Sequence, residues 1–317
     1  MLSATAAGVG EPTAPSTLAL ITIAIHALSR PTIRCTTPDA TASAGPRPVN
    51  GRLRGVTDQL IVRRLSTTPV KGLVLHHPDS IALAEYGAVG DRRFMLVDEA
   101  GKLQSCTHNA ALFGLHAVWD EQARHLAVSR DGAVLVSGTI EPAEQRPMDM
   151  FGLRTIETEV VADPVWEEFF STLLDKRVRL RQARDTAVDV RPVTLLGRSS
   201  LEELSRRAGV PDLDAQRFRM LIEFSGGEPH AEDSWNGRLL RIGAAVIRAE
   251  GPVKRCAATT RNPATGEVDL PTLKMITAYR GRQENLLGVG AMFGIYGDVV
   301  EPGTVAVGDP LEVLDRL

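Results

Sequence analysis

Cysteine is scarce in this chain, whose 317 residues include three, far apart at Cys35, Cys106 and Cys256. Three widely spaced cysteines exclude the disulfide framework of a small secreted domain and fit a reducing compartment, so we expect a cytoplasmic protein. They are also too few to supply a structural zinc site or an iron–sulfur cluster by themselves.

The chain also lacks a strong excess of either charge, with a formal net charge of −3 and a pI near 6.2. This balance gives no general attraction to nucleic acid or to an anionic membrane. An anionic ligand would have to be held by a local cluster of basic side chains. The sequence contains no internal repeat, no P-loop and no Gly-x-Gly-x-x-Gly motif before a helix, which excludes the commonest nucleotide-binding motifs.

Residues 1–55 have few of the side chains that build a core. They are rich in Ala, Thr, Pro and Ser, a composition that buries too little apolar surface to offset the entropy of ordering. The apolar run at residues 18–28 is too short to cross a bilayer. It also lacks the basic start and the clean cleavage site of a signal peptide. We therefore expect a disordered leader and no stable membrane anchor.

From Val56 onward, short strand-like runs alternate with tight turns, and the length suggests about two domains in all. A strand is predicted at residues 60–65, and a hairpin joins residues 93–97 to 102–105. Asp131-Gly132 predicts a second hairpin. Strands at this spacing are typical of a sandwich or a barrel.

Two helices interrupt the strands. Asp163 can cap one of them, with Pro164 at its first position. Ser199 and Glu202 have the spacing of a capping box for the other, and Gly209 is placed to end it. From Arg217 to the end the pattern is again mostly that of strands.

Cys256, in the segment 252–263, is the strongest functional candidate. Lys254 and Arg255 precede it, and such a basic setting favours the thiolate, the form that attacks or binds metal. A thiolate that follows a strand-like run at residues 239–248 could bind a soft metal with open coordination positions. The alternative is a small buried apolar side chain, which is the usual setting of a free cysteine.

Basic side chains stand in three further segments, those of Lys71, Arg92, and Arg217 with Arg219. Lys71 lies in a turn that could present it and nearby N–H groups to an anion. An adjoining aspartate could orient Arg92. Period-2 alternation predicts that Arg217 and Arg219 lie on one face of a strand. Each of these alone is more often an exposed ion pair, but together with the cysteine they suit a phosphate-bearing cofactor.

Several short motifs occur in one order along the chain. They are Thr68–Leu73, Asp91-Arg92 with Phe94, Arg217–Ile222, Ala231–Trp235, Arg255–Thr260, Phe293-Gly294 and Gly308–Pro310. With these in register, the chain from about Val56 to Leu314 resembles the MOSC proteins. It is most similar to the two-domain branch that includes the mitochondrial amidoxime reducing component and its bacterial relatives.

This resemblance implies a molybdenum cofactor, in which one pyranopterin dithiolene, terminal oxo groups and a cysteine thiolate coordinate the metal. It implies Cys256 as the metal ligand and catalytic residue. The other implied cofactor-binding residues are Lys71, Arg92, Ser199 or Ser200, Arg219, Arg255, and Thr259 close to the thiolate. Thr107 or His108 is expected to contact substrate. Two positions depart from the family pattern, since Met220-Leu221 replaces Pro-Asn and Gly72 replaces a common Ser.

The fold implied is mainly β with peripheral helices. Residues 56–163 would form an N-terminal barrel-like domain and residues 164–317 the MOSC β-barrel, with the cofactor at their interface. The activity implied is two-electron reduction of small N-hydroxylated compounds. No ferredoxin-type cysteine cluster is present, so electrons are expected from a separate ferredoxin- or flavin-reductase-type protein.

Two other functions stay open at this point. One is a non-redox molybdenum cofactor carrier or sulfur-transfer module, and the other is an interaction-only double barrel. MOSC domains also occur fused to pyridoxal-phosphate sulfurases. This chain shows no aminotransferase-like domain and no obvious Schiff-base lysine segment, so no pyridoxal phosphate is expected.

Overall fold

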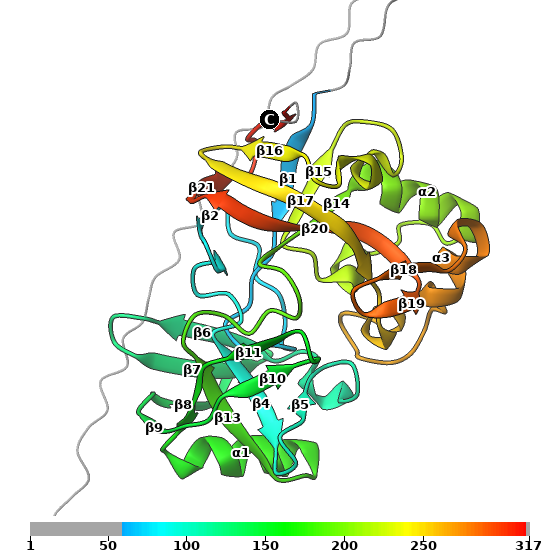
Figure 1. Cartoon of the computed structure of the whole chain (residues 1–317). Coiled ribbons are helices and arrows are strands. Elements are labelled where there is room, and N and C mark those ends of the chain that lie inside the picture. Colours follow the sequence, from blue (N-terminus) through cyan, green and yellow to red (C-terminus); the bar gives the residue numbers. More distant parts are fainter. Residues whose placement is uncertain (1–58, 315–317) are drawn as a thin grey trace, which may run out of the picture. The chain divides into compact units, whose positions relative to one another are not determined.

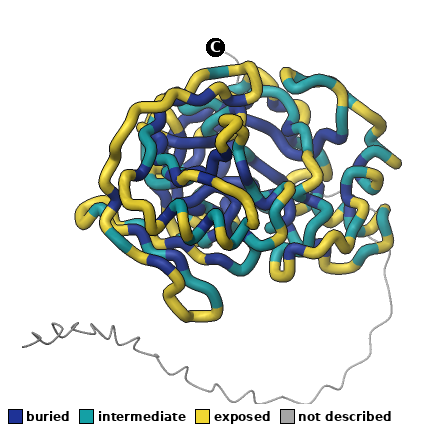
Figure 2. Tube along the Cα trace, turned by 90° about the horizontal axis from the view of Figure 1, so that it is seen from below, coloured by how far each residue is buried: buried dark blue, intermediate teal, exposed yellow. Residues whose placement is uncertain are grey.

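The computed structural model describes residues 59–314, a mainly β segment with three α-helices (Figure 1). The prediction of a β-rich fold with peripheral helices is confirmed. The predicted leader, residues 1–55, lies outside the described residues. Buried stretches gather in the interior of the fold while exposed loops cover the outside (Figure 2).

The largest sheet has seven strands. In spatial order they are β1 (Ile61–Leu65), β15 (Ile222–Ser225), β14 (Val193–Gly197), β20 (Met292–Glu301), β17 (Ala245–Lys254), β16 (Leu239–Ile242) and β22 (Leu311–Val313). Hydrogen bonds also join its two edge strands, since Leu311 N donates to Leu60 O at 2.8 Å and Val62 N to Asp309 O at 2.9 Å. The sheet is therefore a nearly closed barrel, which leaves little free edge.

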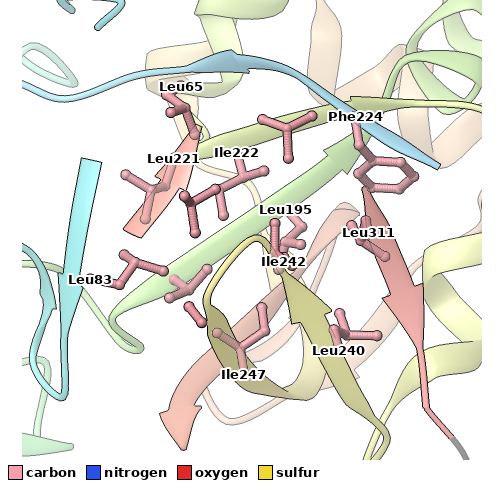
Figure 3. Packing of buried hydrophobic residues seen from close by; sticks show 14 of the residues in the cluster. Leu65, Leu83, Leu195, Leu221, Ile222, Phe224, Leu240, Ile242, Ile247 and Leu311 are labelled. Carbon is pink, nitrogen blue, oxygen red and sulfur yellow. The ribbon is translucent and has the colours of Figure 1, made fainter. Parts of the chain in front are cut away.

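Alternating apolar side chains fill this barrel. Leu195, Ile222, Leu240 and Ile247 converge from four different strands (Figure 3). Full burial of one such side chain contributes roughly 1.5–3 kcal/mol. The barrel is thus a packed core, and a binding site must lie at its rim or outside it.

A second sheet of five strands lies in the N-terminal half. Its order is β5 (Leu103–Gln104), β4 (Phe94–Asp98), β13 (Val178–Ala183), β12 (Thr158–Val161) and β9 (Pro142–Gln145). A three-stranded sheet of β6 (His116–Asp120), β7 (His125–Arg130) and β8 (Ala133–Thr139) shares its core. Helix α1 (Pro164–Leu174) adds Trp166 and Phe170 to the same core.

Smaller elements complete the described segment. The strands are β2 (Ser80–Ala84), β3 (Gly87–Ala88), β10 (Met148–Met150), β11 (Arg154–Ile156), β18 (Gln283–Asn285), β19 (Gly288–Gly290) and β21 (Gly303–Ala306). The helices are α2 (Arg198–Ala208) and α3 (Thr272–Arg280), with 3₁₀ turns η1 (Ala110–Leu112), η2 (Ala215–Phe218), η3 (Ala231–Trp235) and η4 (Ala257–Thr260). None of the helices in residues 59–314 has the length and apolar character that crossing a membrane would require.

The chain moves between the two sheet systems more than once. Strand β1 pairs with β15 and β2 pairs with β21, so residues before Phe94 contribute to the C-terminal half. Conversely β13 pairs with β4, so residues 178–183 belong to the N-terminal half. After β13, the following strand β14 (Val193–Gly197) belongs to the seven-stranded sheet.

The first predicted helix is found as predicted. Asp163 accepts a hydrogen bond from Val165 N at 3.0 Å, and Pro164 opens α1. In contrast, the predicted capping box at Ser199 and Glu202 is wrong, because Gly197 is the N-cap of α2 and no side chain caps it. Gly209, in the left-handed region at φ 65°, ends the helix as expected.

The prediction of a strand through Arg217 and Arg219 is also wrong. Asp214 accepts from Gln216 N at 2.9 Å and starts the 3₁₀ turn η2, so strand β15 begins only at Ile222. Likewise, the run at residues 239–248 is the β16–β17 hairpin rather than one strand. Helix α3 occupies a region where strands were expected.

Candidate functional site

A cavity of about 1120 Å³ is lined by residues of both halves of the described segment. Ligand pockets commonly measure roughly 300–1,000 Å³, so this volume accommodates a cofactor-sized molecule. Five predicted site residues line it: Lys71, Arg92, Arg219, Arg255 and Cys256. The cavity thus brings together a thiol and four basic side chains that are separated by up to 185 positions in the sequence.

Lys71 enters the cavity from the turn after β1. Its backbone N donates to Phe94 O at 2.8 Å, which ties the turn to β4. The buried Nζ lies 2.5 Å from Asp189 Oδ1 and also donates to Ala187 O. Burial lowers the pKa of Lys71, and the neighbouring Asp189 carboxylate partly offsets this effect.

The glycine that follows Lys71 is explained by a close approach of two backbones. Gly72 has φ 97°, and a Cβ atom there would lie 3.1 Å from the backbone N of Cys106. A serine, common at this position in the family, would meet both the positive φ and this contact. The close approach of the Gly72 and Cys106 backbones therefore explains why this chain has glycine at this position.

Arg92 is held rigidly beside Lys71. Its backbone N donates to Thr68 O at 2.6 Å, and its O accepts from Ala187 N at 2.9 Å. The guanidinium bonds to the buried carboxylate of Asp91 and to Arg219 O at 3.3 Å. Arg92 therefore connects the turn of the N-terminal half to the residue that follows η2.

Arg219 and Arg217 have different partners. Arg219, at φ 51°, donates from Nη2 to Leu73 O at 2.7 Å, and burial lowers its pKa. Arg217 forms a two-pronged pair with Asp269, both contacts being 2.6 Å, and bonds to Arg261 O at 2.8 Å. Of these two arginines, Arg219 has no direct carboxylate partner among the described residues. Arg217 is paired with one and anchors the loop that follows η4.

Arg255 follows the last residue of β17, and its N donates to Ala291 O at 2.8 Å. The guanidinium lies over the Phe218 ring at 5.4 Å, bonds to Phe218 O, and contacts Met220 Sδ at 3.2 Å. Its Nε is buried and has no hydrogen-bond partner in the described residues. Burial lowers the pKa of Arg255. A buried donor without a partner is costly, and because protein covers this Nε it does not itself face the cavity.

The two departures at Met220 and Leu221 have separate consequences. Met220 is buried and supplies a thioether to Arg255 in place of a proline. Leu221 packs into the barrel core, and its N donates to Thr194 Oγ1 at 2.9 Å. The amide that the family pattern provides at this position is therefore replaced by an apolar side chain that faces the core.

Cys256 is exposed, so the alternative of a small buried apolar side chain does not hold for it. It has extended backbone (φ −109°, ψ 177°) and directly precedes η4. Its Sγ lies 3.7 Å from Thr107 Oγ1, and Thr107 and His108 both line the cavity. Cys106 also lines the cavity but is buried. The available thiol of the described residues is therefore the one predicted to bind metal.

Three predicted site residues are not brought to the cavity. Thr259 is buried, donates to Cys256 O at 3.0 Å and bonds to Thr272 Oγ1, so it holds the cysteine backbone rather than its sulfur. Ser200 donates to both oxygens of Glu232, at 2.7 and 2.9 Å. The hydroxyl of Ser199 is buried without a hydrogen-bond partner in the described residues, and it does not line the cavity.

Sequence reasoning missed Asp189, a carboxylate that faces the cavity. It lies in the segment between β13 and β14, where no motif marks it. Loss of hydration within the cavity would by itself raise its pKa, but Lys71, followed by Arg92 and Arg255, holds the pKa of Asp189 below its ordinary value. A charged residue shortly before the strand that begins at Val193 was the available sequence signal, and it is a weak one.

Comparisons with known proteins agree with the predicted resemblance. Residues 182–312 match the family model of the MOSC domain. The chain is 27% identical over 273 residues to mitochondrial amidoxime-reducing component 1 of Mus musculus, covering 78% of this chain and 79% of the mouse protein. The Homo sapiens protein of the same name is 35% identical over 132 residues, 40% of this chain and 38% of that protein. Among solved structures, the YUAD protein from Bacillus subtilis aligns with a TM-score of 0.38 and 14% identity, over 80% of this chain and 95% of that chain.

Proposed function

We propose that this chain, whose residues 182–312 form a MOSC domain, binds a molybdenum cofactor and reduces N-hydroxylated compounds with electrons from a separate donor protein. The observation that carries the proposal is the exposed thiol of Cys256 in a cavity whose lining includes the four predicted basic side chains, Lys71, Arg92, Arg219 and Arg255. The similarity to amidoxime-reducing components supports the substrate class.

The residues present fit such a cofactor. The thiolate of Cys256 is a soft donor that suits a metal which also takes sulfur ligands from a dithiolene. Lys71, Arg92, Arg219 and Arg255 offset the charge of a phosphate, and Arg guanidinium groups match phosphate oxygens in geometry.

The protein's part in the reaction is to bind, orient and shield. When bound, the cofactor would supply the two-electron redox chemistry. Cys256 would hold the metal, and the bond from Thr259 to Cys256 O fixes the backbone from which the thiolate projects. Thr107 Oγ1, at 3.7 Å, is placed to donate a hydrogen bond to that sulfur, the kind of contact that tunes a metal ligand.

The cavity wall also controls access. Phe218 and Met220, both buried, lie beside Arg255 and limit contact with water on that side. Thr107 and His108 also line the cavity, and we assign them to contact with the N-hydroxylated substrate. An electron donor of the ferredoxin or flavin reductase type would have to reach the same cavity.

Elemental analysis and pterin detection test this proposal. The wild type, expressed with sufficient cofactor, is expected to carry molybdenum and pterin, and Cys256→Ser is expected to carry less molybdenum than the wild type. Cys106→Ala is the matched control, because it removes a buried cavity thiol and should keep the metal. Absence of molybdenum from the wild-type protein would contradict the proposal.

Turnover then separates an enzyme from a carrier. An amidoxime and a chemically reduced artificial donor should give turnover with the loaded wild type. A protein that binds molybdopterin and molybdenum but shows no turnover would instead be a non-redox carrier or sulfur-transfer module.

A further inference from the structure

We propose that Asp189 is the internal counter-ion of this cavity, and that an incoming anion must displace it from Lys71, so that Asp189 determines which anions bind. The identity of the natural anion, the phosphate ester of a cofactor, rests on the proposed function. The role of Asp189 itself rests on the contacts described next.

The ion pair joins a buried cation to an accessible anion. Asp189 Oδ1 lies 2.5 Å from Lys71 Nζ, yet the Asp189 side chain is 56% exposed and that of Lys71 is 7% exposed. Because both residues line the cavity, the exposed side of the carboxylate faces the space that a ligand would fill. Lys71 is thus reached from the cavity at the position where Asp189 now sits.

The backbone around Asp189 is fixed from both directions. Ala187 N donates to Arg92 O at 2.9 Å, and Arg154 Nη2 donates to Val188 O at 2.6 Å. Lys71 Nζ also donates to Ala187 O, so the lysine stays in place if the carboxylate leaves. A rotation of the Asp189 side chain is then sufficient to open Lys71 to an anion.

The other acids near the cavity are already engaged. Asp91 is buried and bonds to Arg92 and to Thr68 N. Glu99 pairs with Arg177 at 2.9 Å, and Asp149 accepts from Gly152 N at 2.8 Å. Among the acids that line the cavity, Asp189 is the one that pairs directly with a predicted anion-binding side chain, that of Lys71.

The charges that face Asp189 come from several elements. The cations are Lys71 after β1, Arg92 before β4, Arg154 on β11, Arg219 after η2 and Arg255 after β17, and the phenol of Tyr296 on β20 faces the same carboxylate. The cations among them keep the carboxylate ionised at neutral pH, as the lowered pKa of Asp189 also indicates. The Asp189 carboxylate therefore stays charged near neutral pH, and protonation does not release it from Lys71 there.

This arrangement selects against weakly held anions. A small monovalent anion gains one contact with Lys71 and loses the Asp189–Lys71 pair. A dianionic phosphate ester can contact Lys71 and also reach Arg92, Arg219 and Arg255, which line the same cavity. Several charge-assisted hydrogen bonds together can outweigh the displaced carboxylate.

The test is calorimetric binding of inorganic sulfate to cofactor-free protein between about pH 6 and 7, well below the ordinary pKa of lysine. Sulfate is a dianion, as a phosphate ester is, and it does not titrate where carboxyl groups do. Asp189→Asn is expected to bind sulfate about tenfold more tightly than the wild type, a change equivalent to about 1.4 kcal/mol. Asp189→Glu keeps the charge and should stay close to the wild type.

Glu203→Gln serves as the charge control, because Glu203 lies on α2, pairs with Arg206 and Arg207, and does not line the cavity. Its sulfate affinity should match the wild type. Unchanged or weaker sulfate binding by Asp189→Asn would overturn the proposal, as would equal tightening by Asp189→Glu.

If Asp189→Asn does not fold, wild-type calorimetry near pH 5 in two buffers of different ionisation enthalpy decides instead. Displacement from Lys71 raises the pKa of the Asp189 carboxyl, so sulfate binding should take up protons. Binding without proton uptake would overturn the inference. Since the protein carries no cofactor in these experiments, their outcome is separate from whether the chain uses molybdenum.

Discussion

Thr107 Oγ1 lies 3.7 Å from Cys256 Sγ, and Arg261 Nε donates to Thr107 O at 3.3 Å. Thr107 belongs to the loop after β5, whereas Cys256 and Arg261 flank η4 within residues 182–312, which match the MOSC domain model. The thiol is therefore positioned by contacts from both halves of the described segment. Its surroundings depend on the packing between these halves as much as on the local sequence.

The exposure of the two described cysteines predicts a selective reaction with iodoacetamide. Cys256 is exposed and Cys106 is buried, so Cys256 should be alkylated first in the cofactor-free protein. Peptide mass spectrometry follows each site separately. In protein loaded with molybdenum cofactor, Cys256 should be protected because its sulfur is coordinated. Equal labelling of Cys256 in loaded and cofactor-free protein would show that the thiol is not a metal ligand.

The Arg217–Asp269 pair predicts a pH-dependent loss of stability in Asp269→Asn. Hydrogen bonding from Arg217 lowers the pKa of Asp269 in the folded state below its ordinary value of 3.8. The stabilisation is therefore present above about pH 4 and is lost as pH falls through the lowered pKa. Because Asp269 is 34% exposed, we expect about 1–2 kcal/mol at neutral pH, less than the roughly 3–5 kcal/mol of a fully buried pair.

Urea unfolding of wild type and variant at several pH values measures this difference. It should shrink toward zero in acid, where the wild-type carboxyl is also protonated. A difference that stays constant down to strongly acidic pH would mean that the ion pair does not stabilise the loop.

Gly72 predicts a cost for the serine that is common in the family. Gly72→Ser should destabilise the protein by about 1–3 kcal/mol, because it combines positive-φ strain with a contact 3.1 Å from Cys106 N. Gly101→Ser is the matched control, since Gly101 also has positive φ but has no neighbour within 4 Å. Thermal unfolding of both variants gives the comparison. Equal losses would show that the close approach to Cys106 is not the reason for glycine here.

Local sequence signals predicted the turns and helix starts that depend on neighbouring residues. The Asp131-Gly132 turn joins β7 to β8, and Asp163 with Pro164 starts α1, because turn and cap residues act on their nearest neighbours. The grouping of Cys256 with the basic residues followed from the motif order and is found in one cavity.

The missed features depend on partners distant in sequence. Ser200 was predicted to bind the cofactor, yet Glu232 accepts its hydroxyl hydrogen bond, and that contact spans 32 positions. Burial also raises the pKa of Glu232, which marks a carboxylate used inside the fold rather than at the cavity. Asp189 reaches Lys71 across 118 positions. No local pattern reports such contacts, so the sequence alone did not reveal them.

X-ray absorption at the molybdenum edge of purified, cofactor-loaded protein tests the central claim most directly, because it counts the sulfur atoms bound to the metal. The account predicts one sulfur ligand fewer in Cys256→Ser than in the wild type, with Cys106→Ala unchanged. The same number of sulfur ligands in Cys256→Ser and the wild type would contradict it.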